Sequence, residues 1–427
     1  MALGIPTRGS NENDLLKHNR STLVKLLMKN GTCSRAQLAQ TMHLTQAAIS
    51  KITNNLISEG VVEEIHSQKG VKGRRIIPIR LKSDAFQFIG VRITWSYYFV
   101  GVFNISGDCC AYESDGIKDT DRLSDILACI VSRINQYCDR FPKIISAGVS
   151  VPSPYIGNEG WILQIGNEKQ WDDVNVARTI RTQVGIPVYF KNDAKAGALA
   201  EWWFGNHQCK VLFHLLAGES LSSSIIIDGE PFVGAYGIAG EIGHMTIDYR
   251  GRPCDCAPES RGCLAEYCSA RAFLSDVMAN TPSDSKLANL HSPSVLDVFQ
   301  AAKEGDSYCS RKVEELGFYL GVAVANVINL FNPDVVVISD LMTNAGQPLL
   351  DAITKTVKGR IQPYVFERVS IEFSSVSRQW ISDGEHGETA GRTGTVDTPV
   401  LGAVAVAIDM FLEDTSKYVK RDQKQGI

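Results

Sequence analysis

Apolar residues recur at helical spacing in the first part of the chain, and residues that start or stop helices bound these stretches. The first stretch carries leucines on one face and ends at Asn30 and Gly31, a pair typical of helix C-termini. Ser34 and Thr45 stand in position to act as N-caps of two further helices, RAQLAQTM and QAAISKITNNLISEG. The pattern predicts three consecutive helices, with the second and third in helix-turn-helix spacing.

Two short runs rich in β-branched residues, 61–65 and 75–79, follow the third helix and flank a basic, glycine-containing turn, HSQKGVKGR. We therefore expect a winged helix-turn-helix domain over residues 11–82, preceded by a flexible N-terminus over residues 1–10. Small and polar side chains of the third helix would reach base edges, and basic side chains of the wing would lie along phosphates. The expected DNA contacts are Thr45, Gln46, Ala47, Ser50, Lys51, Lys69, Lys72, Arg74 and Arg75.

The pattern changes near residue 86, where apolar strand-like segments begin to alternate with helical ones, as in α/β proteins. The expected strands are FQFIGVRI, YYFVGVFNI, KIISAGVSVP, PVYFKNDA, VLFHLLAG and SSSIIIDG. Residues 380–397 are polar and glycine-rich without apolar periodicity, and a surface loop is expected there rather than a metal site involving His386.

Length and charge support a division into a DNA-binding module and a separate body. At 427 residues the chain is long enough for two or three domains. Residues 1–82 carry a net charge of about +8 and the remainder about −12, and a basic module is attracted to polyanionic DNA. A solvated basic hairpin on a protein-interaction domain is the alternative. Neither a signal peptide nor a transmembrane segment is recognisable, so a cytoplasmic protein without membrane insertion is expected.

One histidine and three cysteines lie between two glutamates in the segment GEIGHMTIDYRGRPCDCAPESRGCLAE, residues 240–266. Zinc binds neutral imidazole and thiolates in a tetrahedron, and a complete set of four protein ligands is typical of a structural site. A disulfide or redox role is the alternative, but the eleven cysteines of this chain come without a secretory signal. We expect one structural Zn²⁺ per chain. The expected ligands are His244, Cys254, Cys256 and Cys263. Cys109, Cys110, Cys129 and Cys138 are expected to fill the interior.

The order E-x-G-H, C-x-C and G-C-x-x-E resembles the ROK family of repressors, open reading frames and sugar kinases, as do KNDAKAGALAEWWFG and PVLGAVAVA. The resemblance implies a two-lobed, actin-like sugar-kinase fold of ribonuclease H-like halves. Lobe 1 would span residues 83–195 and lobe 2 residues 196–427, with a zinc loop over 244–268 and a C-terminal helix returning to lobe 1. The loop between the second and third cysteines is two residues longer than in the family, which makes Cys268 a possible substitute for Cys263.

The family's sugar contacts match a set of polar residues in this chain, and the kinase general base matches Asp193. His244 would bind zinc through one ring nitrogen and a sugar hydroxyl through the other. Plain N-capping of the following helix is the alternative role for Asn192 and Asp193. The implied sugar contacts are Asn167, Asn192, Asp193, Glu241, His244 and Glu266, with Asn167 less direct.

Three segments depart from the family's kinases at the nucleotide side. Arg92 begins the segment that stands where they have an Asp-x-Gly-Gly-Thr turn, and Ser339-Asp340 stands where they have Gly-Gly. Where they have a second glycine-rich turn, Gly-Thr-Gly-x-Gly, this chain has AGESLS with Glu219 in it. Phosphate binding requires close backbone approach at such turns, so we expect no catalytic residues and no phosphorylation.

The resemblance implies a transcriptional regulator, most readily a repressor of carbohydrate uptake or metabolism genes. It would bind operator DNA as a homodimer or tetramer and respond to a sugar or sugar phosphate in the cleft. Two alternatives are an ATP-dependent sugar kinase with an added DNA-binding domain and a regulator sequestered by a sugar-transport protein.

Overall fold

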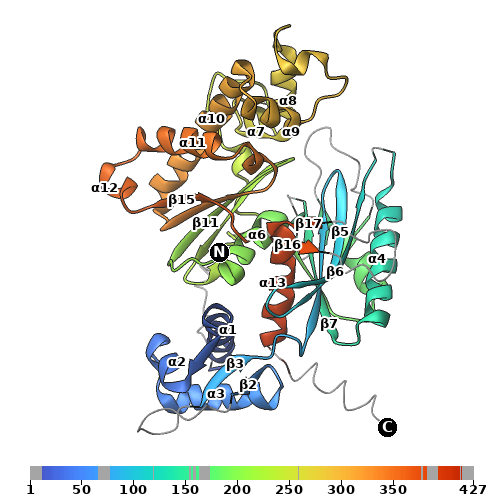
Figure 1. Ribbon diagram of the computed structural model, residues 1–427, viewed down its shortest axis with the longest axis vertical. Helices are drawn as coiled ribbons and strands as arrows, with labels where there is room; N and C mark the ends of the chain where they lie inside the picture. The colour runs from blue at the N-terminus through green and yellow to red at the C-terminus, as the bar shows by residue number, and fades with distance from the viewer. Residues whose placement is uncertain are drawn as a thin grey trace, which may run out of the picture.

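The computed structural model describes most of the chain. It covers residues 12–65, 77–118, 120–152, 155–156, 160–162, 174–257, 259–376, 378–381, 393–413 and 415. Figure 1 shows three regions, the N-terminal domain at the bottom in blue and two lobes above it. Mixed α/β organisation is therefore confirmed.

The N-terminal domain consists of three helices and a small antiparallel sheet. Its elements are α1 (Glu12–Asn30), β1 (Thr32–Ser34), α2 (Arg35–Thr41), α3 (Gln46–Ser58), β2 (Val62–Glu64) and β3 (Pro78–Leu81), with strand order β1-β3-β2. Both predicted N-caps are confirmed, because the side chain of Ser34 accepts from Gln37 N and that of Thr45 from Ala48 N. Gly31 follows α1 with φ +70°, which explains why the helix ends there.

The second strand of the wing differs from its prediction. It starts at Pro78 instead of residue 75 and continues to Leu81, where it pairs with both β1 and β2. Burial of Ile79 and Leu81 on one face decides this register, since a shift by one residue would expose both. Strand β1 was not predicted, because three residues give too short a pattern. The basic wing tip, with Lys69, Lys72, Arg74 and Arg75, lies outside the described residues.

Lobe 1 is a five-stranded mixed sheet covered by helices. Its elements are β4 (Gln87–Ile93), β5 (Tyr97–Asn104), β6 (Cys109–Gly116), α4 (Leu123–Arg140), β7 (Ile144–Val151), α5 (Val176–Gln183) and β10 (Val188–Asn192), with β8 (Tyr155–Ile156) and β9 (Trp161–Ile162) paired separately. The strand order is β10-β7-β4-β5-β6. Antiparallel hairpins join β4 to β5 and β5 to β6. Strand β7 pairs in parallel with both β4 and β10, and helices form the connections to these strands.

Lobe 2 repeats this plan with the strand order β13-β12-β11-β14-β15. Its strands are β11 (Val211–Ala217), β12 (Leu221–Ile227), β13 (Glu230–Pro231), β14 (Val335–Ser339) and β15 (Ser370–Phe373). Its helices are η1 (Ile242–His244), α7 (Ala265–Cys268), α8 (Ala270–Ala279), η2 (Lys286–Asn289), α9 (Val295–Lys303), α10 (Ser307–Phe331), η3 (Leu341–Ala345), α11 (Gln347–Lys358) and α12 (Pro363–Phe366).

Helices α6 (Asp193–Phe204) and α13 (Thr398–Glu413) lie between the two sheets. Glycines bring their backbones into direct contact with their neighbours. A Cβ at Gly402 of α13 would lie 1.8 Å from the carbonyl oxygen of Ala196 in α6, and a Cβ at Gly148 of β7 would lie 1.7 Å from the carbonyl oxygen of Ala403. The small residues in the sequences of both helices are therefore required by this close packing.

The N-terminal domain shares a hydrophobic core with the body. Leu23 and Leu27 of α1 belong to the same buried cluster as Phe411 and Leu412 of α13 and Trp203 of α6. The domain is thus packed on the C-terminal ends of α6 and α13 (Figure 1).

Two sequence predictions are wrong in part. Cys110 and Cys129 are exposed, and Cys109 and Cys138 are only partly buried, because these cysteines lie on an edge strand or off the buried stripe of α4. The segment 380–397 is not a loop throughout, since β16 (Arg378–Ile381) pairs with β17 (Thr393–Val396) at its two ends.

Among the described residues, one helix is long and apolar enough to span a membrane by length and composition alone. This helix is α10, and just over half of its most apolar window, 56%, is buried inside the structure. Leu316, Leu320 and Val324 pack in the core of lobe 2, which is the usual position of an apolar helix in a globular domain.

The substitution Gly402→Ala tests the contact between α6 and α13. The added methyl group would overlap a backbone oxygen, so we expect a loss of about 3 kcal/mol in the free energy of unfolding. Denaturant unfolding monitored by circular dichroism measures this change. The control Gly359→Ala adds the same group where its nearest neighbours lie 3.7 and 3.9 Å away, and a change beyond about 1 kcal/mol is not expected there. Equal effects of both substitutions would contradict this account.

Candidate functional site

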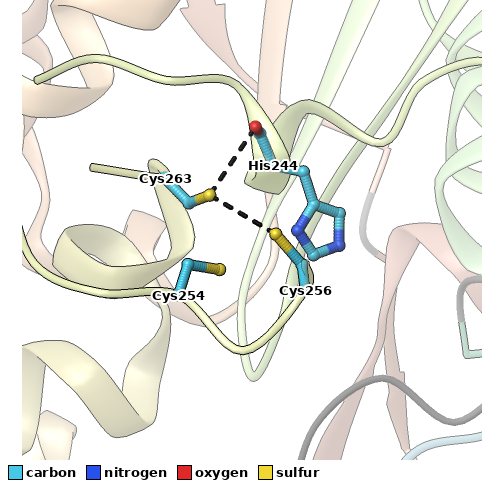
Figure 2. A group of neighbouring side chains, drawn as sticks. All are labelled: His244, Cys254, Cys256 and Cys263. Carbon is cyan, nitrogen blue, oxygen red and sulfur yellow. Dashed lines mark hydrogen bonds between the residues drawn. The ribbon is translucent and has the colours of Figure 1, made fainter. Parts of the chain in front are cut away.

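Four side chains from residues 244–263 converge in one loop region of lobe 2 (Figure 2). The ligand atoms of His244, Cys254, Cys256 and Cys263 all lie within 4.8 Å of one another. The Sγ atoms of Cys256 and Cys263 are 3.7 Å apart. A tetrahedron with Zn–S bonds of about 2.3 Å has edges of about 3.8 Å, so this spacing fits two ligands of one ion.

The hydrogen bonding of this group also fits a metal ion. The Nδ1 atom of His244 is buried and has no hydrogen-bond partner among the described residues, and coordination would satisfy it. A disulfide has an S–S distance of about 2.05 Å, and all eleven cysteines of the chain are free. Cys268 is fully buried outside the group, where burial raises the pKa of its thiol well above the ordinary value. The group therefore could bind a metal ion through one imidazole and three thiols.

The longer loop between Cys256 and Cys263 does not displace the last cysteine. A turn in which Ser260 N donates to Ala257 O takes up the additional residues, and Cys254 N donates to Ser260 O at 2.9 Å. The hydroxyl of Ser260 lies 3.1 Å from the sulfur of Cys256 and 3.2 Å from that of Cys263. Gly262 follows with φ +66°, which allows the chain to turn tightly against the backbone oxygen of Asp248.

The residues expected to contact sugar lie at three neighbouring turns. Asn192 ends β10 and Asp193 begins α6, so both stand at the inner end of that helix. Glu241 directly precedes η1, which ends at His244. Glu266 lies in α7, one turn after Cys263, to which its backbone N–H is bonded. His244 thus joins the metal-binding group to this polar region. Asn167 lies outside the described residues.

Both roles considered for Asn192 and Asp193 are compatible with their positions. The side chain of Asn192 caps α6 by accepting from Lys195 N at 3.0 Å. Asp193 is 5% exposed and accepts weakly from Ser222 Oγ at 3.3 Å. Burial raises the pKa of Asp193 to about 7, with Arg92 opposing the shift and Asp340 and Glu241 adding to it. A carboxyl group with this pKa is only partly ionised at neutral pH.

The nucleotide-side segments meet at one buried ion-pair cluster between the lobes. Arg92 of β4 pairs with Asp340 after β14 at 2.6 Å and with Asp397 before α13 at 2.5 Å. Tyr97 of β5 donates to Asp397 at 2.7 Å. Burial alone would lower the pKa of Arg92, but the two carboxylates raise it well above its ordinary value, so the guanidinium stays charged. We call Arg92, Tyr97, Asp340 and Asp397 the interlobe cluster.

Glu219 closes the same region from lobe 2. Its carboxylate accepts from Trp95 N at 3.1 Å and from the hydroxyl of Ser96. A cavity of about 20 Å³ remains between Asp193, Arg92 and Glu219. This space is far smaller than the roughly 300–1,000 Å³ typical of ligand pockets and holds about one water molecule.

The third helix of the N-terminal domain presents the predicted side chains on one face. Thr45, Gln46, Ala47 and Lys51 are exposed and Ser50 is half-buried. Ile49, Ile52 and Leu56 fill the opposite, buried face. The exposed face is free of bulky apolar groups and has the size and shape that a major groove accepts.

Comparison with known proteins identifies the family. The ROK family matches residues 89–386, and a winged helix-turn-helix DNA-binding domain matches residues 17–63. The xylose repressor of Caldicellulosiruptor bescii is 31% identical over 373 residues, which cover 85% of this chain and 93% of that protein. The chain therefore belongs to the ROK family and carries an N-terminal winged helix-turn-helix.

Two further proteins match most of the chain. The DNA-binding transcriptional dual regulator NagC of Escherichia coli is 28% identical over 351 residues, covering 81% of this chain and 86% of NagC. The crystal structure of a ROK family transcriptional regulator, a homologue of the E. coli MLC protein, superposes with a TM-score of 0.73 and 25% identity. That match covers 95% of this chain and 99% of the solved one. The two-lobed ROK fold is thus confirmed.

Sequence reasoning found the substituted turns but not how they interact. It singled out Arg92, Glu219 and Asp340 as residues that differ from those expected in the family's kinases. It assigned no ion-pair or hydrogen-bond partners to them. It did not identify Tyr97 or Asp397 at all. Asp397 lies 305 residues from Arg92. The only available signal was a buried position for a charged residue at the end of an apolar strand, which requires a counter-charge.

The raised pKa of Asp193 predicts a pH-dependent stability. Between about pH 4 and 7 the folded protein binds a proton that the unfolded protein releases, so the free energy of unfolding falls as the pH rises through this window. Asp193→Asn should reduce this slope, and urea unfolding at pH 4.5, 6 and 7.5 measures it. If the free energy of unfolding has the same pH dependence in the wild type and in Asp193→Asn, Asp193 does not have a raised pKa.

Proposed function

We propose that this chain is a sugar-responsive, DNA-binding transcriptional repressor of carbohydrate uptake or metabolism genes. The observation that carries the proposal is the combination of an exposed recognition face on α3 with a ROK body whose polar turns adjoin the metal-binding group. Relatives named xylose repressor and NagC align with this chain over 93% and 86% of their own length. The exposed residues of α3 would read bases, and Lys69, Lys72, Arg74 and Arg75 would contact phosphates.

The metal in this proposal is a structural Zn²⁺ held by His244, Cys254, Cys256 and Cys263. Zinc favours imidazole and thiolate ligands, and four protein ligands leave no open position for a reacting water molecule. With Nδ1 on the metal, the second ring nitrogen of His244 would be held in position to bind a hydroxyl.

The effector in this proposal is a sugar or sugar phosphate bound by Asn192, Asp193, Glu241, His244 and Glu266, with Asn167 near the same pocket. These groups offer paired acceptors and donors, which hydroxyl recognition requires. D-Xylose and N-acetylglucosamine are the first sugars to test, because two relatives carry repressor or regulator names connected with them.

A regulatory role without phosphoryl transfer is favoured by the interlobe cluster. Arg92 of lobe 1 pairs with Asp340 of lobe 2, and Glu219 of lobe 2 accepts from Trp95 N of lobe 1. These bonds lie in the region where a kinase would need open, glycine-rich turns. The surviving-kinase alternative requires these bonds to break for each nucleotide. We further propose a homodimer or tetramer acting on pseudo-palindromic DNA in the cytoplasm. Sequestration by a sugar-transport protein is the alternative mode of control.

Metal analysis tests the zinc assignment. Purified protein should contain one zinc per chain, and Cys263→Ser should lose most of it because a tetrahedral site would retain only three ligands. Cys268→Ala is the matched control and should keep one zinc, since Cys268 lies outside the group. Elemental analysis measures the metal, and a chelator should lower the thermal midpoint of the wild type. Zinc retained in Cys263→Ser but lost in Cys268→Ala would reverse the assignment.

DNA binding tests the function directly. Fluorescence anisotropy with genomic fragments selected by the protein, titrated with D-xylose, N-acetylglucosamine and their phosphates, should reveal one sugar that raises the DNA Kd about tenfold. This factor corresponds to about 1.4 kcal/mol of coupling. Gln46→Ala should relax the sequence preference, whereas Lys69→Ala should weaken binding to all fragments and reduce the salt slope by about 1.

Each contrary outcome identifies a different error. Sugar-dependent ATP consumption that Asp193→Asn abolishes would support the kinase alternative. DNA binding that no sugar changes would favour a protein partner as the sensor. Failure to select any fragment would rule out the DNA-binding assignment.

A further inference from the structure

One arginine joins the recognition helix to the body. Arg20 of α1 is 7% exposed, and its two terminal nitrogens bond to the carboxylate of Glu59 at 3.0 and 2.5 Å. Glu59 is the C-cap residue of α3. The same guanidinium donates to the carbonyl oxygen of Leu412 at 3.1 Å and to Thr415 Oγ1 at 3.0 Å. One side chain therefore contacts both the end of the DNA-reading helix and the end of α13.

The other end of α13 lies at the interlobe cluster. Asp397 directly precedes the helix and accepts a bond from Val400 N at 3.1 Å through one oxygen. Its other oxygen pairs with Arg92, which in turn holds Asp340 of lobe 2. The start of α13 is thus fixed by charges from both lobes. A change in the separation of the lobes would alter the pairing of Arg92 with Asp340, and Arg92 is also the direct partner of Asp397.

Helix α13 is a continuous and closely packed helix, so we treat it as a rigid unit. Its 16 residues span about 24 Å at 1.5 Å per residue. Backbone contacts at Gly402 with α6 and at Ala403 with β7 leave no room for local bending. A displacement at Asp397 would therefore reach Leu412 without being absorbed in between.

A second, weaker contact joins α1 to the body, in addition to the hydrogen bonds of Arg20. Lys25 of α1 lies over the ring of Trp203 at 4.3 Å, at the C-terminal end of α6, whose first residue is Asp193. Burial lowers the pKa of Lys25 to about 8, with Asp409 and Glu230 opposing the shift. A groove of about 1370 Å³ adjoins this stack between α1, the end of α6 and the edge of lobe 2. Space therefore lies directly beside the contact between α1 and the body.

We propose that Arg20 is a positioning residue that fixes α3 to the end of α13, so that α13 transmits the state of the interlobe cleft to the DNA-binding domain. This inference rests on the proposed function, and it assigns the coupling to particular residues. A ligand that changes the lobe arrangement changes DNA affinity only if the two arrangements place α3 differently. Arg20 couples the two positions, because it is bonded both to the end of α13 and to the end of α3.

A double-mutant cycle on DNA affinity tests the inference without an identified sugar. Asp397→Asn removes one charge from the interlobe cluster while Arg92 remains paired with Asp340, and it should change the DNA Kd at least threefold. Arg20→Lys keeps the charge of the domain but cannot reach Glu59, Leu412 and Thr415 together. In the Arg20→Lys background, the effect of Asp397→Asn should disappear. Distant residues without coupling have additive effects.

Arg35→Lys is the matched control. Arg35 makes a comparable set of bonds, to Thr53, Asn54 and Glu64, all within the DNA-binding domain. Asp397→Asn should retain its full effect in the Arg35→Lys background. Thermal unfolding checks each variant, and Glu59→Gln replaces Arg20→Lys in the cycle if the latter unfolds the domain.

The outcomes separate the inference from the proposed function. Wild-type protein that binds no DNA fragment refutes the function and the inference together. Wild-type binding with equal effects of Asp397→Asn in all backgrounds refutes only the transmission through Arg20. No change in DNA Kd on Asp397→Asn alone also refutes it, because the cluster would then have no influence on α3.

Discussion

The direct backbone contact between α6, α13 and the lobe 1 sheet is the constraint on which the rest of the structure depends. Glycines at positions 148 and 402 allow these elements to approach to distances that any Cβ would forbid. The contact places two helices side by side between the sheets, with Asp193 and Asp397 at their inner ends. It also places the C-terminal ends of both helices against the DNA-binding domain. The cleft and the domain are therefore connected by two rigid helices.

A cluster of ion pairs lies at the inner ends of these helices. Arg92 pairs there with both Asp340 and Asp397, so one positive charge is shared between two carboxylates. Buried ion pairs contribute little net stability compared with apolar packing, but removing one partner is costly. Such a cluster is suited to hold a defined arrangement of the two lobes.

The metal-binding group and the polar turns occupy one continuous stretch of lobe 2. His244 belongs to both, and Glu266 follows Cys263 by a single turn. A metal ion held there would fix the loop that carries three of the proposed sugar contacts. The folding of this loop would then depend on the same four side chains.

The sequence by itself determined the elements and much of the chemistry. Ser34 and Thr45 signal helix starts through local hydrogen bonds, the apolar runs signal strands through burial, and the clustered cysteines signal a shared ligand sphere through their chemistry. These signals are local, so they can be read without the fold. Tertiary structure alone decided that Arg20 meets Leu412 across 392 residues and that Arg92 meets Asp397 across 305. No local pattern specifies such pairs, because the chain path and the glycine-mediated packing of α13 bring them together.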